Sequence, residues 1–187
     1  MNELVFFLEE PSAEVMLKGL LPKIVPEGIA CRMIVFEGKQ DMEKRLVSRL
    51  RGYLNPGARF VILRDKDSGD CITIKNFLHE KCVQAGRPET LIRIACHELE
   101  SWYLADLVAV EQGLNIPGLA RRQNQSLFRN PDKTPNPAYE LQRITGDVYQ
   151  KLSGSRAIAP YLDINNNRSQ SFRVFVTGIQ RLFQAND

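Results

Sequence analysis

The sequence predicts an α/β protein built on a parallel sheet of about four strands, with helices on both faces. Four short apolar segments are nearly continuous in Val, Ile, Leu and Phe, as expected for strands that are buried on both faces. Segments with helical spacing separate them, and this alternation implies right-handed crossovers within one sheet. With 187 residues, the chain is long enough to bury a sizeable core.

The expected elements follow one another along the chain in a regular order. The strands are expected at 4–8, 31–36, 59–63 and 90–95. Three crossover helices are expected at 12–24, 40–54 and 71–86, the first capped by Ser12 and the third stopped by Gly86. After the fourth strand, one unbroken helix is expected to run from 97 to about 113.

The second part of the chain is expected to be a loop and helical extension. Residues 113–138 contain four prolines and are interpreted as a long loop. Two helices are expected near 139–152 and 170–184, with a connecting segment between them. We therefore expect an α/β core over 1–112 and an extension over 113–187 that packs on it.

The charge is divided between these two parts. The core holds 15 Lys and Arg against 17 Asp and Glu, whereas the extension holds 10 against 5. A basic flank beside an acidic part suits a metal centre that faces phosphate. There is no apolar run as long as a membrane span, and the amino terminus lacks the basic region of a signal peptide. We expect a cytoplasmic protein without membrane association, whose four scattered cysteines are free thiols.

Acidic residues follow three of the four expected strands. They are Glu9 and Glu10 after the first strand, Asp65 and Asp67 after the third, and Glu98 and Glu100 after the fourth. Because the carboxyl ends of parallel strands meet at one edge, we expect these acids to lie together. Residues i and i+2 of an extended strand point to the same side, so Asp65 and Asp67 can share a ligand. Oxygen ligands of this kind suit Mg²⁺ or Mn²⁺.

Two of these motifs resemble the toprim domain of topoisomerases, primases and overcoming-lysogenization-defect nucleases. The segment "EPSAE" at 10–14 is similar to its first motif, E-G-x-[ST]-E, with proline in place of glycine, and "DKD" matches its D-x-D. Glu37 in "FEGKQD" is an alternative first-motif acid, but only 28 residues separate it from Asp65. Toprim topology places a strand-helix unit between the two motifs. Glu10 lies 55 residues before Asp65, leaves room for that unit, and is preferred.

Longer segments resemble one uncharacterised prokaryotic toprim-like family, a domain of unknown function. They are "FLEEPSAEVML", "FEGKQDMEKRL", "LRDKDSGD", "RIACHELESWYLADL", "NPDKTPNP" and "YQKLSGSRAIAPYLD". Members of this family are often encoded beside an AAA or SMC-like ATPase in anti-phage systems. The resemblance implies a Mg²⁺-dependent nuclease subunit that acts on nucleic acid, DNA in preference to RNA, with an ATPase partner. Homo-oligomer formation is left open.

The resemblance also implies roles for individual residues. Asp65 and Asp67 would hold one or two metal ions, and Glu10 would be a ligand or the general acid/base. Further metal ligands would come from Glu14, Asp70, Glu98 and Glu100. Cations that neutralise phosphate would come from Lys133, Lys151 and Arg156. Lys151 is the preferred catalytic cation, because the small residues after it allow a ligand backbone to approach closely.

Structural alternatives stand beside these roles. Asp70 would only cap the helix that follows it, Glu100 would be a solvated helix acid, and Trp102 and Tyr103 would belong to the core. The whole chain would then be a non-catalytic module of the same fold that binds nucleic acid or an ATPase. A third hypothesis is a phosphohydrolase or nucleotidyltransferase that acts on small nucleotides.

Overall fold

A computed structural model, which describes residues 2–184, confirms the α/β fold class. Its sheet has four strands, all parallel, in the order β2-β1-β3-β4. The strands are β1 (Glu3–Leu8), β2 (Ala30–Val35), β3 (Ala58–Asp65) and β4 (Leu91–Ala95). Each begins within one residue of its expected start, and β3 continues two residues further than expected, to Asp65. Because β1 and β3 are neighbours, the residues that follow Leu8 lie beside the end of β3.

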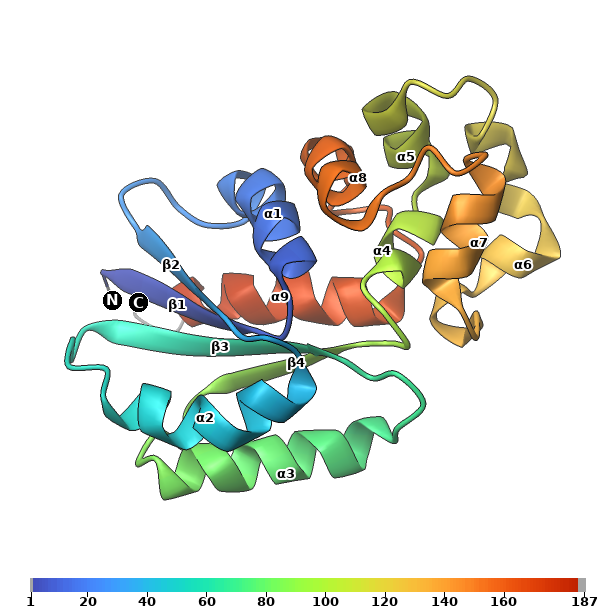
Figure 1. Cartoon of the computed structure of the whole chain (residues 1–187). Coiled ribbons are helices and arrows are strands. Elements are labelled where there is room, and N and C mark those ends of the chain that lie inside the picture. Colours follow the sequence, from blue (N-terminus) through green and yellow to red (C-terminus); the bar gives the residue numbers. More distant parts are fainter. Residues whose placement is uncertain (1, 185–187) are drawn as a thin grey trace.

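Helices cover both faces of the sheet (Figure 1). Helices α2 (Lys39–Arg51) and α3 (Cys71–Gln84) cover one face, and α1 (Pro11–Leu20) and α9 (Gln170–Gln184) cover the other. Successive side chains of β1 point to opposite faces, so Val5 and Phe7 pack in the core under α2 and α3, while Phe6 packs under α1. All three are fully buried. This double burial explains the nearly continuous apolar sequence of the strand.

The remaining helices gather beyond the carboxyl ends of the strands, at the right of Figure 1. They are α4 (Glu100–Leu104), α5 (Leu107–Leu114), α6 (Ser126–Arg129), α7 (Pro137–Ile144) and α8 (Lys151–Ile158). Short 3-10 turns lie at Leu21–Lys23, Ala120–Asn124, Pro131–Lys133 and Ala159–Tyr161. Helix α8 packs on α1, and Trp102 packs against Phe172 of α9, so the extension shares a core with the sheet.

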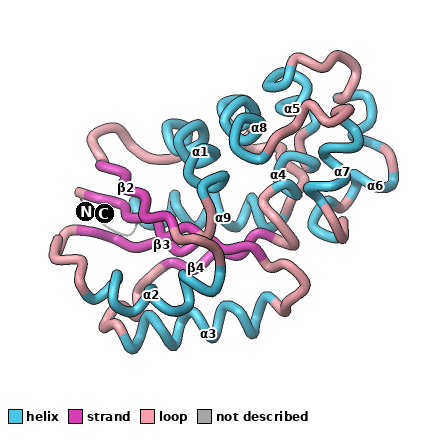
Figure 2. The backbone as a smooth tube through the Cα atoms, viewed as in Figure 1, coloured by secondary structure: helices cyan, strands magenta, loops and turns pink. Residues whose placement is uncertain are grey.

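Several local expectations about helices are wrong. Residues 97–113 form two helices, because Asp106 accepts a hydrogen bond from the Ala109 amide and starts α5 anew. Ser12 does not cap α1, since Glu10 stands at the cap position and Pro11 begins the helix. The helix expected at 139–152 ends at Ile144, and the segment expected as a connection contains α8 (Figure 2).

Two expectations about buried residues and membranes can also be compared with the structure. Trp102 and Tyr103 are fully buried, as the core interpretation predicted. Within residues 2–184, no helix has both the length and the apolar character needed to cross a bilayer.

Candidate functional site

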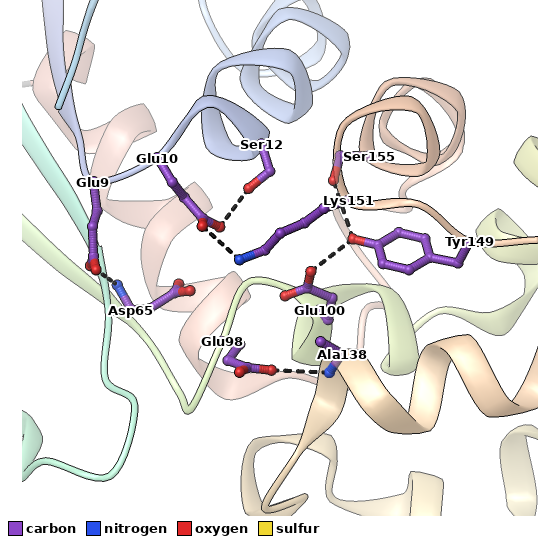
Figure 3. Close-up of polar contacts among 10 residues, drawn as sticks. All are labelled: Glu9, Glu10, Ser12, Asp65, Glu98, Glu100, Ala138, Tyr149, Lys151 and Ser155. Carbon is purple, nitrogen blue, oxygen red and sulfur yellow. Dashed lines mark hydrogen bonds and ion pairs between the residues drawn. The ribbon is translucent and has the colours of Figure 1, made fainter. Parts of the chain in front are cut away.

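The first site residues lie at the junction of β1 and α1. Glu9 accepts a hydrogen bond from the Asp65 amide at 3.3 Å, which ties the end of β1 to the end of β3. Burial raises the pKa of Glu9, and the nearby Arg64 guanidinium only partly offsets this. Glu10 has an extended backbone, and its carboxylate accepts hydrogen bonds from Ser12 Oγ at 2.5 Å and Lys151 Nζ at 2.6 Å (Figure 3).

Asp65, the last residue of β3, stands beside these two glutamates. Burial is the main reason that its pKa lies well above the usual range, and the negative charges of Glu10, Glu100 and Glu9 raise it further. The Lys151 ammonium acts in the opposite direction without cancelling them. Asp65 is therefore a carboxyl group whose ionised form the fold disfavours unless a further cation joins the site.

Glu100 completes the acidic group from the start of α4. It is fully buried, and burial raises its pKa. Its Oε1 accepts a hydrogen bond from the Tyr149 hydroxyl at 2.8 Å, but its Oε2 has no protein partner among residues 2–184. The alternative of a solvated helix acid is therefore wrong. A buried carboxylate oxygen without a partner costs free energy, and a bound cation or water would remove that cost.

Tyr103 adds a second polar atom of this kind. Its hydroxyl is buried and makes no hydrogen bond to the described part of the chain, although Ser155 lies near enough to lower its pKa. Burial is the larger influence, and together with the charges of Glu100 and Asp65 it raises the pKa of Tyr103 well above the usual range. Two buried oxygens near the same acids thus lack a protein partner.

Lys151 is the cation of this group. It is the first residue of α8, and because α8 packs on α1 its amine reaches Glu10 across 141 positions of sequence. Burial lowers the pKa of Lys151, but the hydrogen bond and charge of Glu10 and the charges of Glu100 and Asp65 raise it by more. Figure 3 shows the carboxyl groups of Glu10, Asp65 and Glu100 around this amine. Four residues identified in the sequence are thus brought together.

The chemistry of these donors suits a hard divalent cation such as Mg²⁺. Glu10, Asp65 and Glu100 supply carboxylate oxygens, one of them buried and unpartnered. As the side chains stand, no three His, Cys, Asp or Glu residues of the described chain are placed to enclose an ion. The Glu10 carboxylate is already bound to Lys151, so an entering ion and the ammonium compete for it.

Asp67 does not share a face with Asp65. The strand ends at Asp65, and Asp67 has a left-handed backbone with φ of 51°, so the extended geometry assumed for the D-x-D pair is wrong. The Asp67 amide donates to the His97 carbonyl at 2.8 Å. Its carboxylate pairs with Lys39 at 3.0 Å. The metal-ligand role of Asp67 stays a prediction that this geometry does not favour.

Three further predicted ligands contact other groups instead of joining the acid group. Asp70 caps α3 and accepts hydrogen bonds from the amide and hydroxyl of Thr73, as the structural alternative predicted. Glu14 forms an ion pair with the lysine one turn later in α1, at 2.7 Å. Glu98 accepts a hydrogen bond from the Ala138 amide at the start of α7, at 3.0 Å.

The other two predicted cations lie away from the acid group. Lys133 ends a 3-10 turn and lines a groove with Arg93 beside β4. Arg156 is exposed, more than one turn beyond Lys151 in α8. The alternative acid Glu37 is exposed and follows β2, which β1 separates from β3 in the sheet.

Tyr149 is the site residue that the sequence did not indicate. Its hydroxyl donates to Glu100 and lies 3.4 Å from Ser155 Oγ. Its ring packs so closely on Gly154 that a Cβ there would clash with ring carbons. Gly154, one of the small residues after Lys151, therefore accommodates the ring of Tyr149. A tyrosine five residues before a glycine carries no local signal for this contact.

Replacing Gly154 with alanine tests this packing. Overpacking typically destabilises a protein by about 1–3 kcal/mol, and the better helix propensity of alanine returns at most about 1 kcal/mol. We expect a lower midpoint in chemical denaturation and, because Tyr149 must move, loss of its contact with Glu100. Ser153→Ala, an exposed change in the same helix, should leave the midpoint nearly unchanged. Equal midpoints for both variants would contradict the proposed contact.

Comparison with known proteins identifies one matching family. A family model described as "Domain of unknown function (DUF4276)" matches residues 8–180. This range runs from the end of β1 into α9 and contains every site residue described above. No curated protein and no solved structure matches the chain.

Proposed function

The chain belongs to the DUF4276 family, and we propose that it is a Mg²⁺- or Mn²⁺-dependent nuclease subunit that cleaves phosphodiester bonds. The observation that carries this proposal is the convergence of Glu10, Asp65 and Glu100 on Lys151 at the carboxyl edge of a parallel sheet. Open α/β sheets bind their ligands at this edge. The unpartnered buried oxygen of Glu100 supports a cation as one of those ligands.

Each side chain then has a definite task. A divalent ion held by Glu10, Asp65 and Glu100 would polarise the phosphate and lower the pKa of a water. The Lys151 ammonium would neutralise a non-bridging phosphate oxygen once Glu10 turns to the ion. Tyr149 orients Glu100 by its hydrogen bond. The amino termini of α1 and α8, which begin beside Glu10 and at Lys151, add partial positive charge that favours a phosphate.

The toprim resemblance supports the same proposal. Glu10 follows β1, Asp65 is the last residue of the adjacent strand β3, and the β2-α2 unit lies between them in sequence, which agrees with the spacing used to choose Glu10. DNA as the preferred substrate, a cytoplasmic location, an AAA or SMC-like ATPase partner and a part in anti-phage defence are components of the proposal that rest on the sequence resemblance alone.

Metal binding gives the first test. A ligand that binds only the folded state adds RT ln(1 + [L]/Kd), about 2.7 kcal/mol at a hundredfold excess over Kd. We therefore expect a higher melting midpoint in millimolar Mn²⁺ than in EDTA. Glu100→Gln keeps the contact to Tyr149 but should remove this increase, whereas Glu14→Gln should retain it. Identical midpoints for the wild-type protein in both buffers would count against the metal site.

Cleavage assays then separate the proposal from two rivals. The chain, alone and with the product of an adjacent ATPase gene, is incubated with DNA, RNA and a nucleotide library in Mn²⁺. The ion pair between Lys151 and Glu10 favours a non-catalytic module, because it partly neutralises the acids without metal. Nucleic-acid binding without cleavage or metal stabilisation would support that module. Turnover of small nucleotides alone would support a phosphohydrolase or nucleotidyltransferase.

A further inference from the structure

Two cysteine thiols lie side by side near the candidate site. The Sγ atoms of Cys71 and Cys96 are 4.0 Å apart, close to van der Waals contact, and both residues are partly accessible. They line an open groove of about 440 Å³ beside β4, together with the basic side chains of Lys75, Arg93 and Lys133. A small oxidant can therefore reach both sulfur atoms.

Each of these cysteines belongs to a different segment that carries an acid of the site. Cys71 is the first residue of α3 and follows the turn that begins after Asp65. Cys96 follows β4 and precedes the segment that leads to Glu100. Backbone hydrogen bonds already link the two segments, from Lys66 to the carbonyl of residue 95 at 2.9 Å and from residue 67 to the carbonyl of residue 97 at 2.8 Å. A covalent bond between the sulfur atoms would fix their separation.

We propose that Cys71 and Cys96 are a reversible redox pair, which a hydroperoxide converts to a disulfide that constrains the two acid-bearing segments. One thiol of the pair reduces the O–O bond, releasing an alcohol or water and becoming a sulfenic acid. The other thiol attacks that sulfur, the S–S bond forms and the sulfenic oxygen leaves as water. One peroxide thus takes up the two electrons given by the thiol pair, and a dithiol reductant reverses the reaction.

The surroundings of each thiol indicate which one moves. Cys71 is the first residue of the 14-residue helix α3. Cys96 is held through its amide by Ser171 Oγ at 3.3 Å and through its carbonyl by Ser101 Oγ at 2.6 Å. A disulfide needs the sulfur atoms about 2.05 Å apart, so they must approach by about 2 Å. Residue 72, next to Cys71, is 70% exposed, so the movement falls on the first turn of α3.

Peptide mapping after peroxide treatment tests the pair in the full chain. We expect a loss of about 2 Da per chain and a peptide linked through Cys71 and Cys96, both reversed by dithiothreitol. Cys71→Ser and Cys96→Ser should each prevent the linkage, while Cys31→Ser, a change at an exposed cysteine outside the pair, should not. A disulfide that involves Cys31, or links between chains in place of the internal one, would overturn the proposal.

Amide hydrogen exchange tests the constraint separately. Exchange at 66–70 and 96–99 should slow in the oxidised protein and recover on reduction, whereas exchange in α9 should not change. Unchanged rates in a protein shown to be linked would overturn the constraint. An altered Mn²⁺-dependent melting shift is a further expectation that rests on the proposed function. If the reduced protein shows no such shift, the proposed metal site is contradicted. The disulfide is tested independently by the peptide map.

Discussion

Replacing Asp65 with asparagine is expected to abolish Mn²⁺-dependent cleavage and, without metal, to stabilise the folded protein. The carboxyl group lies among Glu10, Glu100 and Glu9, whose charges add to burial in raising its pKa. Asparagine has nearly the same shape without the charge, so it removes this repulsion. Changes to residues that only orient metal ligands typically reduce metal affinity or activity by about 10–100-fold, so removal of a direct ligand should reduce activity by more. We therefore expect cleavage to fall by at least about 100-fold.

The pH dependence of stability checks the same idea. An acid whose folded-state pKa is raised binds more protons when folded than unfolded, between its unfolded and folded pKa values. Its contribution to stability therefore falls as pH rises from the usual Asp range through the raised value. The wild-type protein in EDTA should lose stability over this window relative to Asp65→Asn. Denaturation midpoints of the two proteins, measured from pH 4 to pH 8, should diverge as pH rises.

Asp67→Asn is the matched control for these measurements. Its side chain is 39% exposed and pairs with Lys39, and ion pairs between exposed side chains contribute little to stability. We therefore expect only slightly lower stability. Its effect on cleavage also examines the D-x-D resemblance, because that resemblance assigns a metal to both aspartates. Full activity in Asp67→Asn would show that the resemblance extends to the fold but not to the metal role of this aspartate. A stability profile over pH identical to that of Asp65→Asn would contradict the different surroundings described for the two aspartates.

The parts of the site that follow from strand order could be predicted from the sequence. Parallel strands place their carboxyl ends at one edge, so Glu10 and Asp65 were identified without knowledge of side-chain positions. The cap formed by Asp70 is also a local pattern. Asp67 was misplaced because the i, i+2 rule holds only while the chain stays extended. The pairing of β3 with β4 ends at Asp65 and Ala95. In the turn that follows, the left-handed backbone of Asp67 breaks the regular alternation of side chains.

The rest of the site depends on contacts between distant parts of the chain. Glu100 becomes a buried acid because α7 packs against α4 and because Tyr149, which lies between α7 and α8, donates a hydrogen bond to its carboxylate. Lys151 was chosen for the small residues that follow it, yet it reaches Glu10 because α8 packs on α1. Gly154 leaves the space that the ring of Tyr149 occupies. The spacing of residues in the sequence does not predict these contacts, because they form only when the helices of the extension have packed in three dimensions.

Replacing Lys151 with methionine should have effects on stability and metal affinity that oppose those of Asp65→Asn. Methionine keeps much of the apolar length but removes the charge that faces Glu10, Asp65 and Glu100. In EDTA the folded protein should become less stable, because three carboxyl groups lose their cation. Divalent ions should bind more tightly, because no ammonium competes for Glu10. Cleavage should nevertheless fall by about 10²–10³-fold, the usual cost of removing one group that stabilises developing charge.

The pH window and a double variant make this expectation specific. Because the folded-state pKa of Lys151 is raised, its stabilisation is fully present below the unfolded value of 10.5 and is lost only as pH rises through the folded value. The titration of Lys151 itself should thus not change the difference between wild type and Lys151→Met from pH 7 to pH 9. Arg156→Met, which removes an exposed charge from the same helix, should change neither stability nor metal affinity appreciably. Combining Lys151→Met with Asp65→Asn should recover part of the lost stability, because the charge of each group shifts the pKa of the other. Simple additivity in that cycle would show that the lysine does not balance the acids, and the case for a cation-dependent site would then rest on Glu100 alone.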